Sequence, residues 1–286
     1  MTSVLQKVSI YFRMVKFSHS VFALPFAFTA AIIAASGIPT VTQIFWIVVA
    51  MVGGRSGAMG LNRIIDRHID QANPRTASRE LPKGLIGVRE AGIFVIISFG
   101  FMIYASYMLN PLCLMLSPVA IAILILYSYT KRFTWVSHFF LGIAISAAPI
   151  GAWIAVRGTF DIEILVLGCA VVFWLAGFDI LYALQDRAFD KKYGLYSIPQ
   201  TFGVRNSLRL SRIFHVIAFL FLFVNAFVFG LGGFYWAGLF LVAGLFLYEH
   251  SLVSEHDLSK LNMAFFNMNG YISTTVFFGT LMDYLV

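Results

Sequence analysis

The sequence predicts an all-α integral membrane protein with nine transmembrane helices in a bundle and a cytoplasmic cap. Hydrophobic residues make up 60% of its 286 residues and charged residues only 12%, whereas a soluble domain carries about 25% charged residues. The mean hydropathy is +0.85. The apolar residues form runs close to the roughly 20 residues that a spanning helix needs. We expect a single transmembrane domain over residues 1–286.

Nine apolar runs are long enough to cross a bilayer, and helix-breaking residues separate several of them. Gly37 follows the first run, Asn110 and Pro111 lie between the third and fourth, and Gly230 follows the seventh. The expected spans cover residues 17–36, 43–61, 90–108, 111–129, 136–156, 162–183, 208–229, 233–250 and 262–284.

The basic residues gather on one side of this predicted bundle, because every second connection between spans is basic. Every Lys and Arg except Arg157 falls on one side, in the N-terminal tail, in the loops of that side or in the parts of the spans that adjoin them. Cytoplasmic loops carry the excess of Lys and Arg. The pattern therefore predicts a multi-pass protein of a bacterial-type cytoplasmic (inner) membrane, with a cytoplasmic N-terminus and an outward C-terminus. These loops also account for the net charge of +7, so no nucleic-acid partner is expected.

An acidic motif occurs twice, at the inner ends of the second and sixth predicted spans. The first copy, N-R-I-I-D-R-H-I-D, covers residues 62–70, and the second, Y-A-L-Q-D-R-A-F-D, covers residues 182–190. Each holds two aspartates four residues apart, which share one face of a helix. The repeat predicts two related halves facing each other across one site. Each motif runs into a long loop, 62–89 or 184–207, where we expect a short helix and a turn that cap the bundle.

The paired carboxylates predict a metal site. Asp66, Asp70, Asp186 and Asp190 offer the oxygen ligands that Mg2+ prefers, together with oxygens of a phosphate substrate. Asn62, one turn before the first pair, adds a neutral oxygen. Two like charges 4 Å apart repel by about 4 kcal/mol at an effective dielectric near 20, so a cation is expected. The alternative is that these aspartates pair with neighbouring arginines on a solvated loop.

Two charged residues lie inside predicted spans. Asp179 sits about two turns before Asp186, where a charge costs about 2.5 to 3.5 kcal/mol and usually marks function. Arg55 lies two turns before Asn62 and suits a substrate carboxylate. Its alternatives are a salt bridge to Asp179 or snorkelling to the surface.

Basic and aromatic residues near the motifs suit a phosphorylated, hydrocarbon substrate. Basic side chains hold anions such as diphosphate, and aromatic faces stabilise cations. The candidates are Arg75, Arg79, Lys131, Arg132, Lys191, Lys192, Tyr127 and Tyr182. Most loop Lys and Arg residues are alternatively topology signals only. The later polar residues Glu249, His250, Glu255, His256 and Asp257 are expected to form a solvated loop.

These motifs resemble the UbiA superfamily of intramembrane prenyltransferases, over nearly the whole chain. The flanking segments look like its 4-hydroxybenzoate polyprenyltransferase branch, and also like related menaquinone-pathway enzymes acting on a dihydroxynaphthoate. These segments are G-R-S-G-A-M-G-L-N-R, N-P-R-T-A-S-R-E-L-P, Y-S-Y-T-K-R-F and G-F-D-I-L-Y-A-L-Q-D. One departure is Arg63, where many members have aspartate.

The resemblance implies Mg2+-dependent transfer of a polyprenyl group from polyprenyl diphosphate to an aromatic acid of the 4-hydroxybenzoate type in quinone biosynthesis. It implies that Arg75 and Lys131 contact the diphosphate, that Tyr127 lines the pocket, and that Arg55 holds the carboxylate of the acceptor. The residues implied to hold Mg2+ on the diphosphate are Asn62, Asp66, Asp70, Asp179, Asp186 and Asp190.

Other functions stay open at this point. The acceptor is alternatively 1,4-dihydroxy-6-naphthoate in menaquinone biosynthesis. An ion-coupled membrane transporter also uses buried aspartates, but it tends to bind near the bilayer midplane, whereas these acids cluster at the cytoplasmic edge. A CDP-alcohol phosphotransferase would hold its acids in one glycine-spaced motif, which this sequence lacks.

Overall fold

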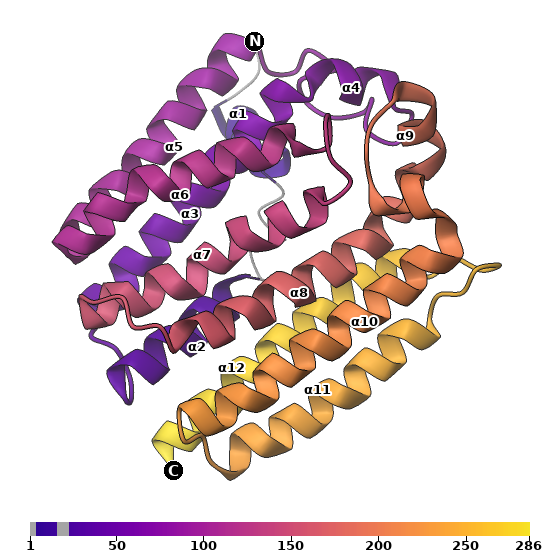
Figure 1. Ribbon diagram of the computed structural model, residues 1–286. Coiled ribbons are helices and arrows are strands. Elements are labelled where there is room, and N and C mark those ends of the chain that lie inside the picture. The colour runs from indigo at the N-terminus through magenta and orange to yellow at the C-terminus, as the bar shows by residue number, and fades with distance from the viewer. Residues whose placement is uncertain (1–3, 16–22) are drawn as a thin grey trace. The chain divides into compact units, whose positions relative to one another are not determined.

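The computed structural model describes residues 4–15 and 23–286, and the described residues form helices without any strand. The prediction of an all-α protein is confirmed. The chain divides into two compact units, residues 1–20 with 44–129 and residues 21–43 with 130–286. Each unit is described by itself below, with helix labels as in Figure 1.

The first unit is held together by a close approach of two long helices. A side chain at Gly53 would lie 2.7 Å from the backbone oxygen of Ser98, and one at Gly57 would lie 2.6 Å from the ring of Phe99. Small residues let helix backbones come together in this way. The helices of this unit are α1 (Val4–Met14), α3 (Val41–Ile65), α4 (Arg67–Ala72), α5 (Val88–Leu109) and α6 (Pro111–Thr130).

Helix α1 packs on the first unit through one apolar face. Met14 is fully buried in a cluster with Ile86 and Ala91. The ring of Tyr11 stacks on Phe94 with centroids 5.0 Å apart. Ile64 of the first acidic motif packs against the same cluster, so the C-terminal end of α1 lies against that motif.

Helix α8 is the buried centre of the second unit. It packs against α7, α10 and α2, and Figure 1 shows it between α7 and α10. Gly177 of α8 leaves room for the His215 ring of α10, and Ser211 Oγ donates to the Gly177 oxygen at 2.7 Å. The helices of this unit are α2 (Ala23–Ala35), α7 (Ser137–Arg157), α8 (Ile164–Ala183), α9 (Arg187–Tyr193), α10 (Ile198–Val228), α11 (Gly233–Ser251) and, after a π-helical turn (Met263–Met268), α12 (Asn269–Leu285).

Every predicted span contains a helix, although part of the first, residues 17–22, lies outside the described residues. The expected breaks occur at Gly37, Asn110 and Gly230. Among the described residues, six stretches are long and apolar enough to cross a membrane, and Ala23–Ala35 is a shorter apolar helix. The six are Val41–Ile65, Val88–Leu109, Pro111–Thr130, Ser137–Arg157, Ile164–Tyr193 and Ile198–Val228. The count of nine spans, the cap and the single domain stay predictions.

The prediction of a solvated loop after residue 248 is wrong for Glu249 and His250. Both lie in α11, which continues to Ser251, and Glu249 is fully buried. Asn269 Nδ2 donates to its Oε1 at 3.4 Å, and Nδ1 of His215 lies 2.9 Å from Nε2 of His250. Buried polar groups are tolerated when they bond to one another. The rest of the segment, Glu255, His256 and Asp257, is exposed as expected.

Candidate active site

The first acidic motif is helical, with one irregular residue in it. Helix α3 ends at Ile65, α4 begins at Arg67, and Asp66 between them has φ −89° and ψ 2°. The backbone N–H of Asp66 donates to Asn62 O at 2.9 Å and that of Asp70 to Asp66 O at 2.7 Å. These helical bonds place the three side chains on one face, as the spacing predicts. Asp66 is 1% exposed and Asp70 is 3% exposed.

The second motif repeats this local structure. Helix α8 ends at Ala183, a 3-10 turn follows, and Asp186 has φ −99° and ψ 0° immediately before α9. The leading aspartates of the two motifs therefore have nearly the same backbone, in the sparsely allowed bridge region where many active-site residues lie. Asp190, one turn later, accepts a hydrogen bond from Ser197 Oγ at 2.9 Å. The sequence repeat is thus also a repeat of local structure.

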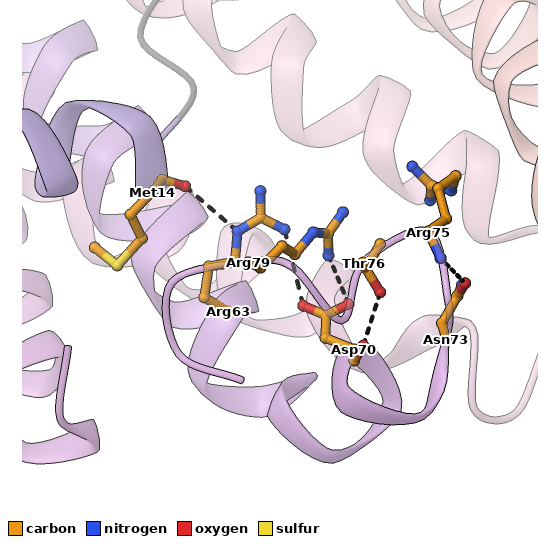
Figure 2. A network of polar contacts seen from close by, with 7 residues as sticks. All are labelled: Met14, Arg63, Asp70, Asn73, Arg75, Thr76 and Arg79. Carbon is orange, nitrogen blue, oxygen red and sulfur yellow. Dashed lines mark hydrogen bonds and ion pairs between the residues drawn. The ribbon is translucent and has the colours of Figure 1, made fainter. Parts of the chain in front are cut away.

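A buried polar network surrounds Asp70 (Figure 2). Arg79 Nη1 lies 2.6 Å from Asp70 Oδ1, and Arg63 Nη1 lies 3.9 Å from Oδ2. Arg63 also donates from Nε to the Met14 oxygen at 3.3 Å, and Thr76 Oγ1 donates to the Asp70 backbone oxygen at 3.1 Å. Part of the alternative considered from the sequence is therefore present, because an arginine pairs with an aspartate of the motif. The pair is buried, however, and does not form a solvated surface.

The donor atoms of the motifs fit Mg2+ arriving with a phosphate ligand. Oδ2 of Asp70 is buried and accepts no hydrogen bond from the described part of the chain. Within those same residues no three His, Cys, Asp or Glu side chains come close enough to hold an ion. Mg2+ is usually bound by one or two carboxylates plus substrate phosphates and water. A pair of carboxylates in each motif suits that mode of binding.

Arg55 and Asp179 both lie inside helices, as expected. Arg55 is half-buried in α3, and its buried Nε finds no hydrogen-bond partner in the part of the chain that the structure describes. The Asp179 side chain is 22% exposed in α8 and lies 2.7 Å from Nδ1 of His138. The fold places His138 beside Asp179 from 41 positions earlier in the chain. Sequence reasoning missed His138 because no local spacing links the two residues.

The remaining predicted binding residues lie near the ends of their helices. Arg75 follows α4 in a turn where its N–H donates to Asn73 Oδ1 at 3.0 Å. Tyr127 and Tyr182 are half-buried in the last turns of α6 and α8. Lys131 is half-buried just after α6, and its backbone oxygen accepts from Tyr196 N at 2.8 Å. That residues of the two motifs share one site stays a prediction.

The helices and their acidic ends define a multi-pass membrane protein. The UbiA prenyltransferase family matches residues 23–271. A 4-hydroxybenzoate octaprenyltransferase of Shewanella woodyi is 31% identical over 99% of this chain and 100% of its own length. One of Vibrio parahaemolyticus is 32% identical over 73% of this chain and 71% of its own length. The chain belongs to the UbiA prenyltransferase family.

Solved structures show the same fold. The apo structure of a UbiA homolog from Aeropyrum pernix superposes with a TM-score of 0.85 at 30% identity, covering 93% of this chain and 98% of the homolog. A UbiA homolog from Archaeoglobus fulgidus, bound to GPP and Mg2+, superposes with a TM-score of 0.68 at 20% identity. That comparison covers 97% of this chain and 100% of the other.

Proposed function

We propose that this aromatic prenyltransferase transfers a polyprenyl group from polyprenyl diphosphate to 4-hydroxybenzoate in a Mg2+-dependent reaction of quinone biosynthesis. The observation that carries the proposal is the repeated acidic motif, which has the same backbone at Asp66 and at Asp186. The full-length similarity to a 4-hydroxybenzoate octaprenyltransferase supports the acceptor. The homolog solved with GPP and Mg2+ supports the donor class and the metal.

The acidic motifs would hold the metal. Bound Mg2+ would supply positive charge to the departing diphosphate. The residues that we assign to Mg2+ binding are Asn62, Asp66, Asp70, Asp186 and Asp190. We assign Asp179 as a further catalytic carboxylate.

The basic and aromatic residues act on the two ends of the donor. Arg75 and Lys131 donate hydrogen bonds to diphosphate oxygens, and such charge-assisted bonds are about twice as strong as neutral ones. Tyr127 and Tyr182 turn their π faces to the allylic cation that remains when the carbon–oxygen bond breaks. A water-excluded pocket protects that cation from hydrolysis.

The acceptor is held through its carboxylate. Arg55 suits this role because it lies within α3 and its buried Nε has no hydrogen-bond partner among residues 4–15 and 23–286. Arginine also matches a carboxylate with two donors. The ring carbon ortho to the phenol then forms the new carbon–carbon bond to the prenyl cation. The proton on that carbon is lost to a carboxylate, to water or to the released diphosphate.

The same carboxylate contact would also serve 1,4-dihydroxy-6-naphthoate, so the acceptor must be tested directly. Purified protein in detergent is given geranyl diphosphate, Mg2+ and each acid, and the products are separated by mass. We expect prenylated 4-hydroxybenzoate together with stoichiometric diphosphate, and no turnover with EDTA. Product from the naphthoate alone would identify the menaquinone-pathway reaction. Absence of diphosphate release with both acids would contradict prenyl transfer.

Variants connect that activity to the motifs. Asp66→Ala and Asp186→Ala should each abolish turnover while the protein still inserts and purifies. Asp257→Ala, on an exposed loop, is the matched control and should keep full activity. Wild-type turnover of either motif variant at excess Mg2+ would count against the assignment.

We also propose nine spans in one domain over residues 1–286, with residues 62–89 and 184–207 as a cytoplasmic cap of an inner-membrane protein. The N-terminus would be cytoplasmic and the C-terminus outward. Cysteine labelling tests this topology. Cys113 and Cys169 are first replaced by alanine, and a single cysteine is then introduced at Ser254 or at Thr159. An impermeant thiol reagent applied to intact cells should label position 159 and leave position 254 unlabelled.

A further inference from the structure

His138 lies in the first turn of α7 and contacts one of the proposed catalytic carboxylates. It is 3% exposed, and its ring makes two polar contacts, one at each nitrogen. Nδ1 lies 2.7 Å from Asp179 Oδ2 in α8, and Nε2 lies 3.3 Å from the backbone nitrogen of Ile198, the first residue of α10. The ring therefore joins the starts of two helices to the side chain of a third.

The two contacts together identify which nitrogen carries the ring proton. A backbone N–H can only donate, so Nε2 of His138 accepts from Ile198 and bears a lone pair. The ring proton is then on Nδ1, where it is donated to Asp179 Oδ2. A neutral imidazole in this orientation stabilises a carboxylate through a hydrogen bond without cancelling its charge. A lysine or arginine at this position would add a full positive charge.

The start of α10 is also tied to a second acid. Ser197, the N-cap of α10, accepts from Gln200 N at 3.2 Å and donates from Oγ to Asp190 Oδ2 at 2.9 Å. Ser197 and Ile198 are 5% and 0% exposed. Two consecutive buried residues thus fix Asp190 directly and Asp179 through His138. The positions of both carboxylates therefore depend on the backbone at the start of α10.

We propose that His138 is a positioning residue for prenyl transfer, which holds the Asp179 carboxylate in one orientation by donating from Nδ1 while Ile198 anchors its Nε2. The inference rests on the proposed function, in which Asp179 is a catalytic carboxylate. Partners that orient the groups around a metal site typically change affinity or activity by about 10- to 100-fold when they are replaced. His138 itself does not touch substrate in this assignment.

Two substitutions separate the two hydrogen bonds of the ring. The amide nitrogen of asparagine occupies about the position of Nδ1, so His138→Asn keeps the donor to Asp179 and loses the acceptor for Ile198. The amide oxygen of glutamine reaches about the position of Nε2, so His138→Gln keeps that acceptor and loses the donor. His256→Gln, on an exposed loop, is the matched control.

The measurements are kcat, KM for both substrates, and the unfolding temperature in detergent. We expect His138→Gln to lower kcat by about 10- to 100-fold, while His138→Asn keeps most of the activity and His256→Gln keeps all of it. A purely structural role predicts instead that the two His138 variants lose activity equally, in proportion to their loss of thermal stability. That result, or wild-type kcat in His138→Gln, would overturn the proposal.

A second readout does not depend on turnover. The family resemblance implies that Asp179 also holds Mg2+ on the diphosphate. Mg2+ with inorganic diphosphate should therefore raise the unfolding temperature of the wild type and of His138→Asn more than that of His138→Gln. Equal shifts in all three proteins would overturn the positioning role. If this difference is found but no acid is prenylated by the wild type, the proposed function fails while the positioning of Asp179 stands.

Discussion

Asp70 forms ion pairs with two arginines: Arg79 Nη1 lies 2.6 Å from its Oδ1, and Arg63 Nη1 lies 3.9 Å from its Oδ2. The Asp70 side chain is 4% exposed and that of Arg79 is 19% exposed. Arg63, at the position where many UbiA members have aspartate, also bonds to the last residue of α1, Met14. Arg63 therefore offsets the charge of Asp70 and also links the first motif to helix α1.

Removal of Arg79 should destabilise the first unit. Arg79→Ala leaves the Asp70 carboxylate buried, with the longer Arg63 contact as its one remaining ion pair in the described part of the chain. Breaking a buried pair costs about 3 to 5 kcal/mol. The control is Arg67→Ala, because Arg67 is exposed and its Nη1 donates to the backbone oxygen of Ile64 at 3.3 Å, with no carboxylate involved in that bond. Thermal unfolding in detergent measures both. Equal unfolding temperatures of the two variants would show that the pair contributes nothing.

Arg55 should govern the affinity for the acidic acceptor. A hydrogen bond to a charged group contributes about 1.5 to 3 kcal/mol, so Arg55→Gln should raise KM for 4-hydroxybenzoate by roughly 10- to 100-fold. KM for the prenyl donor should stay unchanged. Arg89→Gln, on an exposed residue, should alter neither constant.

A neutral analogue sharpens the Arg55 experiment. 4-Hydroxybenzaldehyde lacks the carboxylate, so the wild type and Arg55→Gln should use it equally poorly. If the substitution impairs the aldehyde and the acid to the same extent, Arg55 acts on the protein structure and not on the carboxylate.

The packing of α3 on α5 should not tolerate a methyl group at Gly53. A Cβ there would lie 2.7 Å from Ser98 O and 2.8 Å from Met102 N, both backbone atoms that cannot rotate away. Gly53→Ala should therefore lose about 1 to 3 kcal/mol of stability. Gly100 in α5 has open space around it, so Gly100→Ala should gain about 0.5 to 1 kcal/mol. Unfolding temperatures in detergent compare the two.

The loop between α7 and α8 should lose stability in acid. The indole N–H of Trp153 donates to Asp161 Oδ2 at 2.8 Å and holds the pKa of Asp161 below its ordinary value. A carboxyl whose pKa is lower in the folded state stabilises the fold above its unfolded pKa, about 3.9 for aspartate. This contribution disappears as the pH falls through the folded value.

Asp161→Asn tests that pH dependence. The variant should unfold at a lower temperature than the wild type at pH 7, and the difference should shrink as the pH is lowered below about 4. Glu163→Gln, two residues later and exposed, should show no such convergence. A gap between wild type and Asp161→Asn that is constant with pH would contradict the role of the ionised carboxylate.

Much of the fold was readable from local sequence. Apolar runs near 20 residues predict helices because a backbone in lipid must satisfy its own hydrogen bonds, and a helix lies in each predicted span. The i, i+4 spacing placed Asp66 and Asp70 on one face for an equally local reason. The family resemblance likewise rested on contiguous motifs, and the family match confirmed it.

The sequence by itself determined the helical membrane class, the family and the paired acids, since these depend on composition and on residues within a turn or two of each other. Only the tertiary structure decided which partners those acids have: Arg79 and Arg63 on Asp70, Ser197 on Asp190, and His138 on Asp179. It also decided that Glu249 is buried. The contact of His138 with Asp179, 41 positions apart, is made by the packing of α7 on α8. The pairs of Asp70 and Asp190 lie seven to nine positions apart and depend on how the chain turns after each motif. Charge patterns along the chain do not encode which of these side chains will satisfy a buried carboxylate.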